Sequence, residues 1–194
     1  MDSADNDRTG WLLKYVPWLK FLARQEIDSR FAGKFDSSDA VQQTLVAAWQ
    51  GWQQFRGSTE AQRMAWLRQI LAHQLANLAR YYSGAQMRAV DRERSIDQSL
   101  SQSSHRLDGL LISNDSSPSA VAMENENRLR LACVIESLPE DYRQVILLRN
   151  FQDLPYQEIA IRMQRSEGAI RMLWVRALTA LRDALRAYPR TELL

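Results

Sequence analysis

Apolar residues recur every three or four positions in several long segments, and this helical spacing is the feature that most limits the fold. The clearest case is residues 60–82, where one face carries Met64, Leu67, Leu71, Leu75 and Leu78. Seven Gly and five Pro in 194 residues leave few turn signals for a series of short strands. The sequence therefore predicts an all-α protein.

Two more helices are expected before residue 60. Residues 11–30 form the first, and Ser37, Ser38 and Asp39 are N-cap candidates for the second, which runs to about Phe55. Apolar residues at helical spacing give the second helix an inward face that consists of Val41, Leu45, Ala48, Trp49 and Trp52. Asp39, Gln42, Gln43 and Val46 then point away from the core. We expect the large aromatic side chains Trp49, Trp52 and Trp66 to be core residues.

A serine-rich segment divides the chain. Nine of the 25 residues from 95 to 119 are serine, and Ser116-Ser117-Pro118 lies near its end. Such a composition predicts a flexible tether. We therefore expect two small helical domains, residues 1–90 and 120–194, joined by a flexible linker at 91–119.

The second domain contains a helix-turn-helix pattern. A helix near 119–137 should end before Leu138-Pro139, and residues 140–151 should form another. Pro155 then suits the first turn of a short helix, Gln164 and Arg165 make the turn, and Ser166 is an N-cap for the next helix. Gln164 stands where glycine is common, so we expect backbone strain there.

The outward positions near the start of that last helix are those with which a recognition helix reads base edges. They are Glu167, Gly168, Arg171, Met172 and Val175. Residues 162–190 include seven Arg against two acidic residues, and 22 of the 25 basic residues of the chain are Arg. The planar guanidinium group suits phosphates and base edges, although a GC-rich genome produces the same bias.

Several classes of site lack the residues they need. With one cysteine, Cys133, and only His73 and His105, we expect no metal site and no disulfide. No catalytic constellation can be placed, so we expect neither an enzyme nor a cofactor. The acidic N-terminus and an apolar stretch interrupted by Lys14, Pro17 and Lys20 predict no signal peptide or membrane span, and hence a cytoplasmic protein.

Four segments in order resemble the extracytoplasmic-function (ECF) type sigma factors of bacterial RNA polymerase. Residues 39–45, DAVQQTL, resemble the D-x-V-Q-[DE]-T-F segment of that family, and Trp66-Leu67 followed by Ile70 resembles its W-L-x-x-I motif. Residues 137–149, SLPEDYRQVILLR, are similar to its S-L-P-x-x-x-R-x-V-x-x-L-R signature, and the helix-turn-helix follows directly. Gln43, Leu45, His73, Asn77 and Leu173 depart from the family pattern, so the promoter sequence cannot be inferred.

The resemblance implies that the first domain acts like sigma region 2 and the second like sigma region 4. It implies no nucleotide hydrolysis by this chain. Core RNA polymerase would bind Asp39, Gln42 and Gln43. The minus-10 element, with one base taken out of the stack, would meet Phe55, Arg56, Gly57, Ser58, His73, Asn77 and Arg80. The minus-35 element would meet Arg165, Ser166, Glu167, Gly168, Arg171 and Arg176. Promoter DNA and core polymerase are the expected partners, and an anti-sigma protein is a further candidate.

Two other classes remain open on the residues alone. A helix-turn-helix regulator could bind DNA without being a polymerase subunit, but a response-regulator type would need alternating strands ahead of it. A helical adaptor would bind proteins only.

Overall fold

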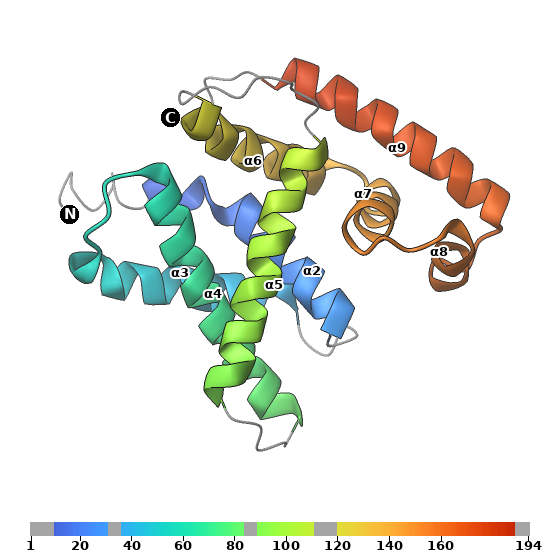
Figure 1. Cartoon of the computed structure of the whole chain (residues 1–194). Coiled ribbons are helices and arrows are strands. Elements are labelled where there is room, and N and C mark those ends of the chain that lie inside the picture. The colour runs from blue at the N-terminus through green and yellow to red at the C-terminus, as the bar shows by residue number, and fades with distance from the viewer. Residues whose placement is uncertain (1–9, 31–35, 84–88, 111–119, 189–194) are drawn as a thin grey trace. The chain divides into compact units, whose positions relative to one another are not determined.

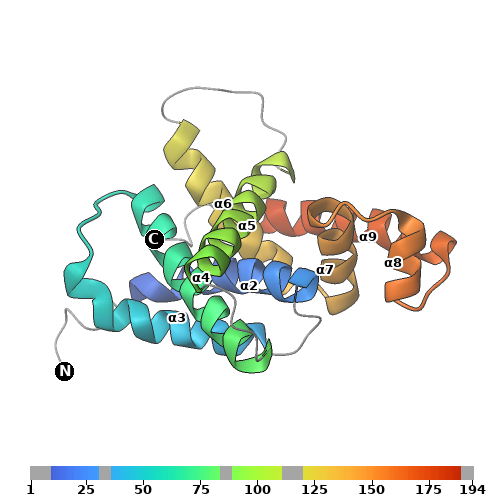
Figure 2. The same ribbon diagram turned by 60° about the horizontal axis from the view of Figure 1, so that its bottom comes forward.

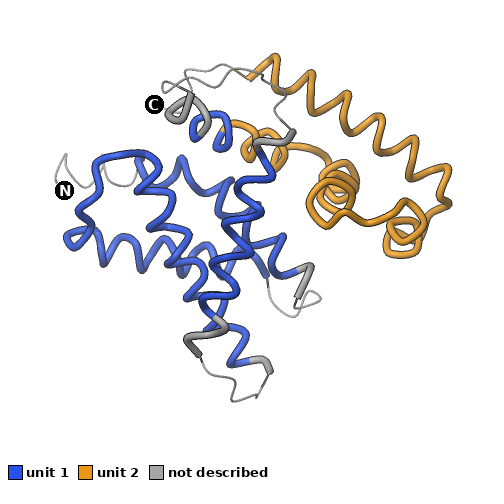
Figure 3. Tube along the Cα trace, in the orientation of Figure 1, with its two compact units in different colours: residues 1–129 blue, residues 130–194 orange. Residues whose placement is uncertain are grey.

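The computed structural model describes residues 10–30, 36–83, 89–110 and 120–188 (Figure 1). Every regular element within these ranges is helical, which confirms the all-α prediction. The α-helices are α2 (Val16–Arg30), α3 (Ser37–Gly51), α4 (Glu60–Ser83), α5 (Ala89–Leu110), α6 (Ala120–Ser137), α7 (Glu140–Ile146), α8 (Tyr156–Arg162) and α9 (Glu167–Ala187). A 3₁₀ turn, η1 (Trp52–Gln54), follows α3, and a π-helical turn, η2 (Leu147–Phe151), follows α7. The chain forms two compact units, residues 1–129 and 130–194 (Figure 3).

Unit 1 is built on α2, α3, α4 and α5. Helix α4 packs against α3 and α5, and α2 packs against the same two helices. Figures 1 and 2 show α4 and α5 side by side. Four of the five residues expected on the inner face of α4 are buried, namely Met64, Leu67, Leu71 and Leu75. The helical spacing therefore identified the face of α4 that enters the core.

Helix α5 replaces much of the expected linker, because residues 91–110 are helical rather than a flexible tether. Ile96, Leu100, Ser104 and Leu107 are buried and recur every three or four residues, so they form one face against α2 and α4. The Trp18 indole Nε1 donates to Ser104 Oγ at 3.3 Å. Packing of this face outweighs the modest helix propensity of serine. The rest of the expected linker, 111–119, lies outside the described residues. The boundary between the two units falls between Leu129 and Arg130, within α6.

The helix starts in unit 1 follow local capping chemistry. The N-cap of α3 is Asp36, one residue before the predicted candidates, and its carboxylate accepts a hydrogen bond from the Ser38 N–H at 3.0 Å. That bond is the main reason why the pKa of Asp36 is lowered. At the start of α4, Thr59 and Gln62 form a capping box: Gln62 Oε1 accepts from the Thr59 N–H, and Thr59 Oγ1 accepts from the Gln62 N–H.

The expected first helix is interrupted. Residues 10–13 are helical, Lys14 and Tyr15 form a turn, and α2 begins at Val16. Pro17 has no N–H and so cannot donate to the carbonyl of Leu13, which explains the break.

Unit 2 packs α9 against α7 and α8. Helix α6 ends at Ser137, before Leu138-Pro139, as predicted. The buried Arg143 joins α6 to α7, because its Nη1 donates to the Glu136 carbonyl at 2.6 Å and its Nη2 donates to Glu140. The expected helix over residues 140–151 is α-helical to Ile146 and π-helical after it.

Candidate nucleic-acid interface

The predicted helix-turn-helix is present in unit 2. Helix α8 ends at Arg162, and Gln164 has a φ of 52°, the left-handed conformation that the sequence led us to expect. The turn is closed by a hydrogen bond from the Arg165 N–H to the Ala160 carbonyl at 2.9 Å. Ser166 Oγ accepts from the Ala169 N–H at 3.2 Å and so caps α9.

Helix α9 has distinct inner and outer faces. Ile170, Leu173, Ala177 and Leu181 are buried against the unit. The outward positions predicted near its start are exposed, namely Glu167, Gly168, Arg171, Met172 and Val175. A Cβ added at Gly168 would meet nothing within 4 Å, so the backbone there is open to close approach by a ligand.

Arg171 is held in place by two neighbours. Its Nη2 donates to Glu167 Oε1 at 2.5 Å, and its Nε donates to the same oxygen at 3.2 Å. The guanidinium carbon lies 5.1 Å from the centre of the Tyr156 ring, within cation–π range. Glu167 is the main reason why the pKa of Arg171 is raised, so the group stays positively charged. A guanidinium has five N–H donors, so Arg171 keeps donors for a further acceptor.

Other arginines surround this face. Arg165 donates to Asp141 at 2.6 Å, and Arg162 donates to Glu158 at 3.2 Å. Arg176 is exposed one turn beyond Arg171. The guanidinium carbon of Arg149 lies 4.8 Å from the centre of the Tyr156 ring. The start of α9 is therefore an exposed, positively charged surface of the kind that binds phosphates.

Unit 1 carries a second candidate surface, a pocket beside the loop after η1. Its volume is about 650 Å³. The lining includes Phe55, Arg56, Gly57, Gln62, Trp66 and Ile70. The rings of Phe55 and Trp66 are stacked, with centres 4.8 Å apart and an interplanar angle of 28°. An aromatic wall with an exposed arginine at its edge can hold a planar, charged ligand such as a nucleotide.

Gly57 is required by the packing of this pocket. A Cβ at this position would overlap the Phe55 ring and would lie 2.9 Å from Gln62 Cβ. Ser58 does not line the pocket, but its N–H donates to Gln62 Oε1 at 2.9 Å and fixes the end of the loop.

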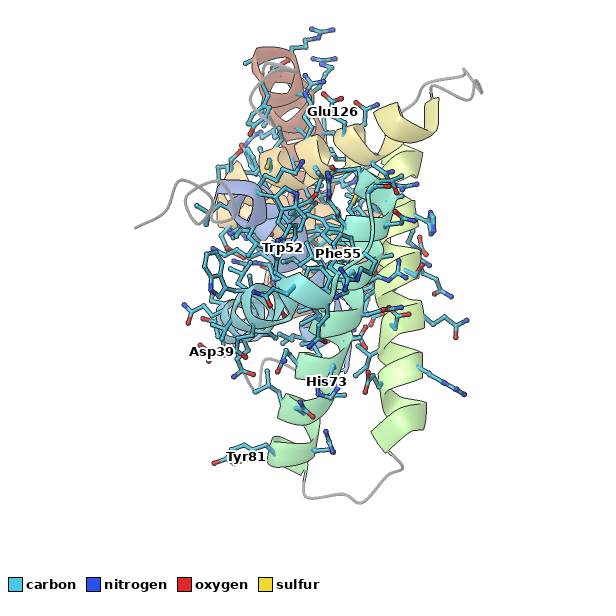
Figure 4. The ribbon with its side chains drawn as sticks, turned by 90° about the vertical axis from the view of Figure 1, so that its left-hand side faces the viewer. Asp39, Trp52, Phe55, His73, Tyr81 and Glu126 are labelled. Carbon is cyan, nitrogen blue, oxygen red and sulfur yellow. The ribbon has the colours of Figure 1, made fainter. Side chains whose placement is uncertain are left out.

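The other predicted minus-10 residues lie farther along α4. Figure 4 shows Phe55, His73 and Tyr81 at successive levels of this part of unit 1. His73 Nδ1 lies 3.1 Å from Glu93 Oε2 of α5, and Arg80 donates to Asn77 Oδ1. The structure therefore gathers Phe55, Arg56 and Gly57 at one pocket and places His73, Asn77 and Arg80 outside it.

Helix α3 presents a third surface. Asp39, Gln42 and Gln43 are exposed as predicted, and Asp39 is labelled in Figure 4. Trp49 was expected in the core, but 40% of it is exposed. The core positions of α3 are Ala40, Val41, Thr44 and Ala48, and Trp49 falls at the edge of the opposite face. Trp52 and Trp66 are half-buried, with ring centres 6.2 Å apart.

Comparison with known proteins relates these surfaces to a family. The model of the family "Sigma-70, region 4" matches residues 128–181, which include the helix-turn-helix. The ECF RNA polymerase sigma-E factors of Salmonella typhimurium (strain 14028s) and Escherichia coli (strain K12) are each 32% identical over 153 residues, 79% of this chain and 75% of the relative. The chain belongs to the ECF sigma factors.

The match is not confined to the helix-turn-helix. Residues 128–194 are far fewer than the 153 that match, so the similarity of this sigma factor to its relatives extends well into unit 1. A solved structure of the flagellar sigma/anti-sigma complex Sigma-28/FlgM is 16% identical, covers 97% of this chain and all of its own, and has a TM-score of 0.39. Because this TM-score is low, the assignment to the ECF sigma factors rests on the sequence matches alone. Sigma factors are non-catalytic DNA-binding regulators that direct transcription initiation.

Sequence reasoning missed part of the pocket of this sigma factor. Gln62, Trp66 and Ile70 line it, although Trp66 was expected in the core. Their spacing of four residues was a usable signal, because it places them on a face of α4 other than that of Leu67 and Leu71.

No group of three or more His, Cys, Asp or Glu that could hold a metal ion occurs in the described ranges. None of the helices described here is long and apolar enough to span a membrane.

Proposed function

We propose that this sigma factor binds core RNA polymerase through α3, reads and opens the minus-10 element with unit 1, and reads the minus-35 element with α9. The observation that carries the proposal is the exposed, arginine-flanked start of α9 within the segment that resembles Sigma-70 region 4. No catalytic step is assigned to the chain itself, and opening of the DNA is driven by binding.

At minus-35, Ser166, Glu167, Gly168 and Arg171 face the base edges, and Arg165 and Arg176 lie nearer the phosphates. Arg171 is the basic side chain that is exposed within the first turn and a half of α9, where base edges come within reach. Its contacts with Glu167 and Tyr156 restrict the guanidinium before DNA arrives. This restriction lowers the entropy lost on binding.

At minus-10, the pocket beside Phe55, Arg56 and Gly57 receives a base that has left the stack. The stacked rings of Phe55 and Trp66 offer an aromatic surface for that base, and the exposed Arg56 can pair with a phosphate. Ser58 holds the loop end through Gln62. His73, Asn77 and Arg80 then contact the opened strand farther along α4.

At core polymerase, the exposed face of α3 supplies polar and apolar contacts. Asp39, Gln42 and Gln43 are joined on that face by Val46, which is 57% exposed, and by Trp49. An exposed tryptophan beside polar groups is a common centre of a protein interface.

The test is in vitro transcription with the full chain and purified core polymerase on a library of promoter sequences. We expect transcription from a defined pair of elements. The Asp39→Ala and Gln42→Ala double variant should weaken core binding in a fluorescence titration, whereas Gln98→Ala and Gln102→Ala, exposed on α5, should not. Specific DNA binding without any core binding would instead indicate a helix-turn-helix regulator. That alternative is not favoured, because the similarity to sigma factors extends beyond the helix-turn-helix.

Strand opening needs a separate measurement. Arg80→Ala should reduce permanganate-reactive thymines at minus-10 on linear DNA, and a pre-melted template should restore much of the activity. An equal loss on both templates would contradict a role of Arg80 in melting.

A further inference from the structure

Two apolar side chains stand in the middle of the outward face of α9. Met172 is 55% exposed and Val175 is 52% exposed. Scattered apolar residues on a surface need no explanation, but these two are three residues apart and therefore adjacent on one helix face. They belong to the helix on which the proposed minus-35 contacts lie.

The arginines of α9 flank this pair. At about 100° per residue, Gly168, Met172, Val175 and Thr179 follow one stripe along the helix. Arg171 falls to one side of the stripe and Arg176 to the other, and both are exposed. Ile170, Leu173 and Ala177 face the opposite way and are buried. The apolar pair thus lies between two positive charges.

This arrangement limits the chemistry of the partner. Flanking guanidinium groups favour a polyanion and disfavour a purely apolar protein surface, which would offer no acceptor to Arg176 or to the N–H donors of Arg171 that Glu167 does not occupy. In the major groove, the base edges offer hydrogen-bonding atoms and one apolar group, the C5-methyl of thymine. A strip of apolar side chains between arginines is complementary to a thymine-containing major groove.

We propose that Met172 and Val175 read thymine C5-methyl groups within the minus-35 element, an inference that rests on the proposed minus-35 role of α9. From Gly168 to Val175 the helix rises about 10 Å, the length of roughly three base-pair steps. Val175 is β-branched and stiff at χ1, so it selects a methyl group at one fixed position. Met172 is unbranched and tolerates a neighbouring position as well.

The experiment removes the methyl group without changing the base pairing. The full chain, bound to core polymerase, is titrated onto the promoter selected from the library. Each thymine of the minus-35 element is replaced in turn by deoxyuridine. The binding of the unaltered protein should weaken about three- to fourfold at one or two positions, as expected for one methyl group no longer buried. On a promoter variant that carries cytosine at the position read by Val175, 5-methylcytosine in place of that cytosine should strengthen binding.

The variants then identify the side chains. Val175→Ala should abolish the effect of deoxyuridine at one position, and Met172→Ala should reduce it at another, while both keep the fold because the side chains are exposed. Ile161→Ala is the matched control, since Ile161 is 72% exposed but lies on α8. This control should retain the full sensitivity to deoxyuridine.

Two results would overturn the proposal. The first is a minus-35 element in which deoxyuridine has no effect at any position, or which contains no thymine. The second is a loss of activity in Met172→Ala and Val175→Ala that is equal on thymine and deoxyuridine templates, which would indicate a protein partner at this strip. If α9 does not read the minus-35 element at all, the result is different: transcription does not change when the whole minus-35 sequence is altered.

Discussion

Replacing Gln164 by glycine should stabilise unit 2. Gln164 is exposed and has a φ of 52°, a conformation in which the Cβ of an L-residue crowds the following carbonyl oxygen. Its N–H donates to the Ile161 carbonyl at 3.2 Å, and the next N–H closes the turn, so the backbone is bound to this conformation. Glycine can keep both hydrogen bonds without the crowding.

The size of the effect is the difference between two opposing contributions. Relief of the left-handed conformation contributes about 1–2 kcal/mol to the stability of the folded state. The greater freedom of glycine in the unfolded chain opposes it by roughly 0.4–1 kcal/mol. The midpoints of these two ranges give an expected net gain for Gln164→Gly of about 0.8 kcal/mol, which in a domain of the size of unit 2 raises Tm by roughly 3–6 °C.

The same substitution at Gln157 is the matched control. Gln157 is exposed in the first turn of α8 and has helical backbone geometry, so Gln157→Gly should cost about 0.5–1 kcal/mol. Stability is measured by thermal unfolding and by hydrogen exchange in peptides from α8 and α9, which report on unit 2. The reasoning is refuted if Gln164→Gly destabilises unit 2 as much as Gln157→Gly does.

Three further predictions concern the other sites. Gly57→Ala should push the neighbouring phenyl ring from its stack, cost about 1 kcal/mol and abolish minus-10 activity in transcription assays, whereas Gly10→Ala, with nothing within 4 Å of the added Cβ, should change neither. Arg171→Ala should weaken DNA binding by about 1–3 kcal/mol and flatten the preference at one base pair, whereas Arg176→Ala should weaken all sequences alike and lower the salt slope by about one. A library randomised at minus-35, titrated at two salt concentrations, separates these outcomes, and an unchanged base preference in Arg171→Ala would remove it from the readout. Asp36→Ala should cost about 1 kcal/mol at neutral pH through loss of the N-cap. Folding lowers the pKa of Asp36, so the stabilisation by its carboxylate is complete above the ordinary aspartate pKa of about 3.9. This stabilisation is lost as the pH falls through the pKa of Asp36 in the folded protein. The Tm values of the unaltered protein and of Asp36→Ala, measured by thermal unfolding, should therefore converge in acid.

Much of this protein follows from short-range chemistry. The end of α6 before Pro139, the cap at Ser166 and the strained turn at Gln164 each depend on residues within one helical turn, and all three were predicted. The outward positions of α9 follow from helical spacing in the same way, as does the exposure of Asp39, Gln42 and Gln43 on α3. The motifs that resemble the family lie on these same segments, which is why the sequence alone identified the class of protein.

Contacts between distant segments decided the rest. The serine-rich segment is helical because α2 and α4 cover Ile96, Leu100 and Leu107, and serine content alone cannot reveal that. Trp49 was predicted in the core from its spacing, yet it lies at the edge of the face opposite the buried positions of α3 and is 40% exposed. The pocket at Phe55 exists because a loop residue stacks on Trp66 of α4, and Arg171 is held by the Tyr156 ring of another helix. Spacing along the chain defines the faces of a helix, but burial and partners depend on which neighbour covers each face, and that is settled only when the helices pack together.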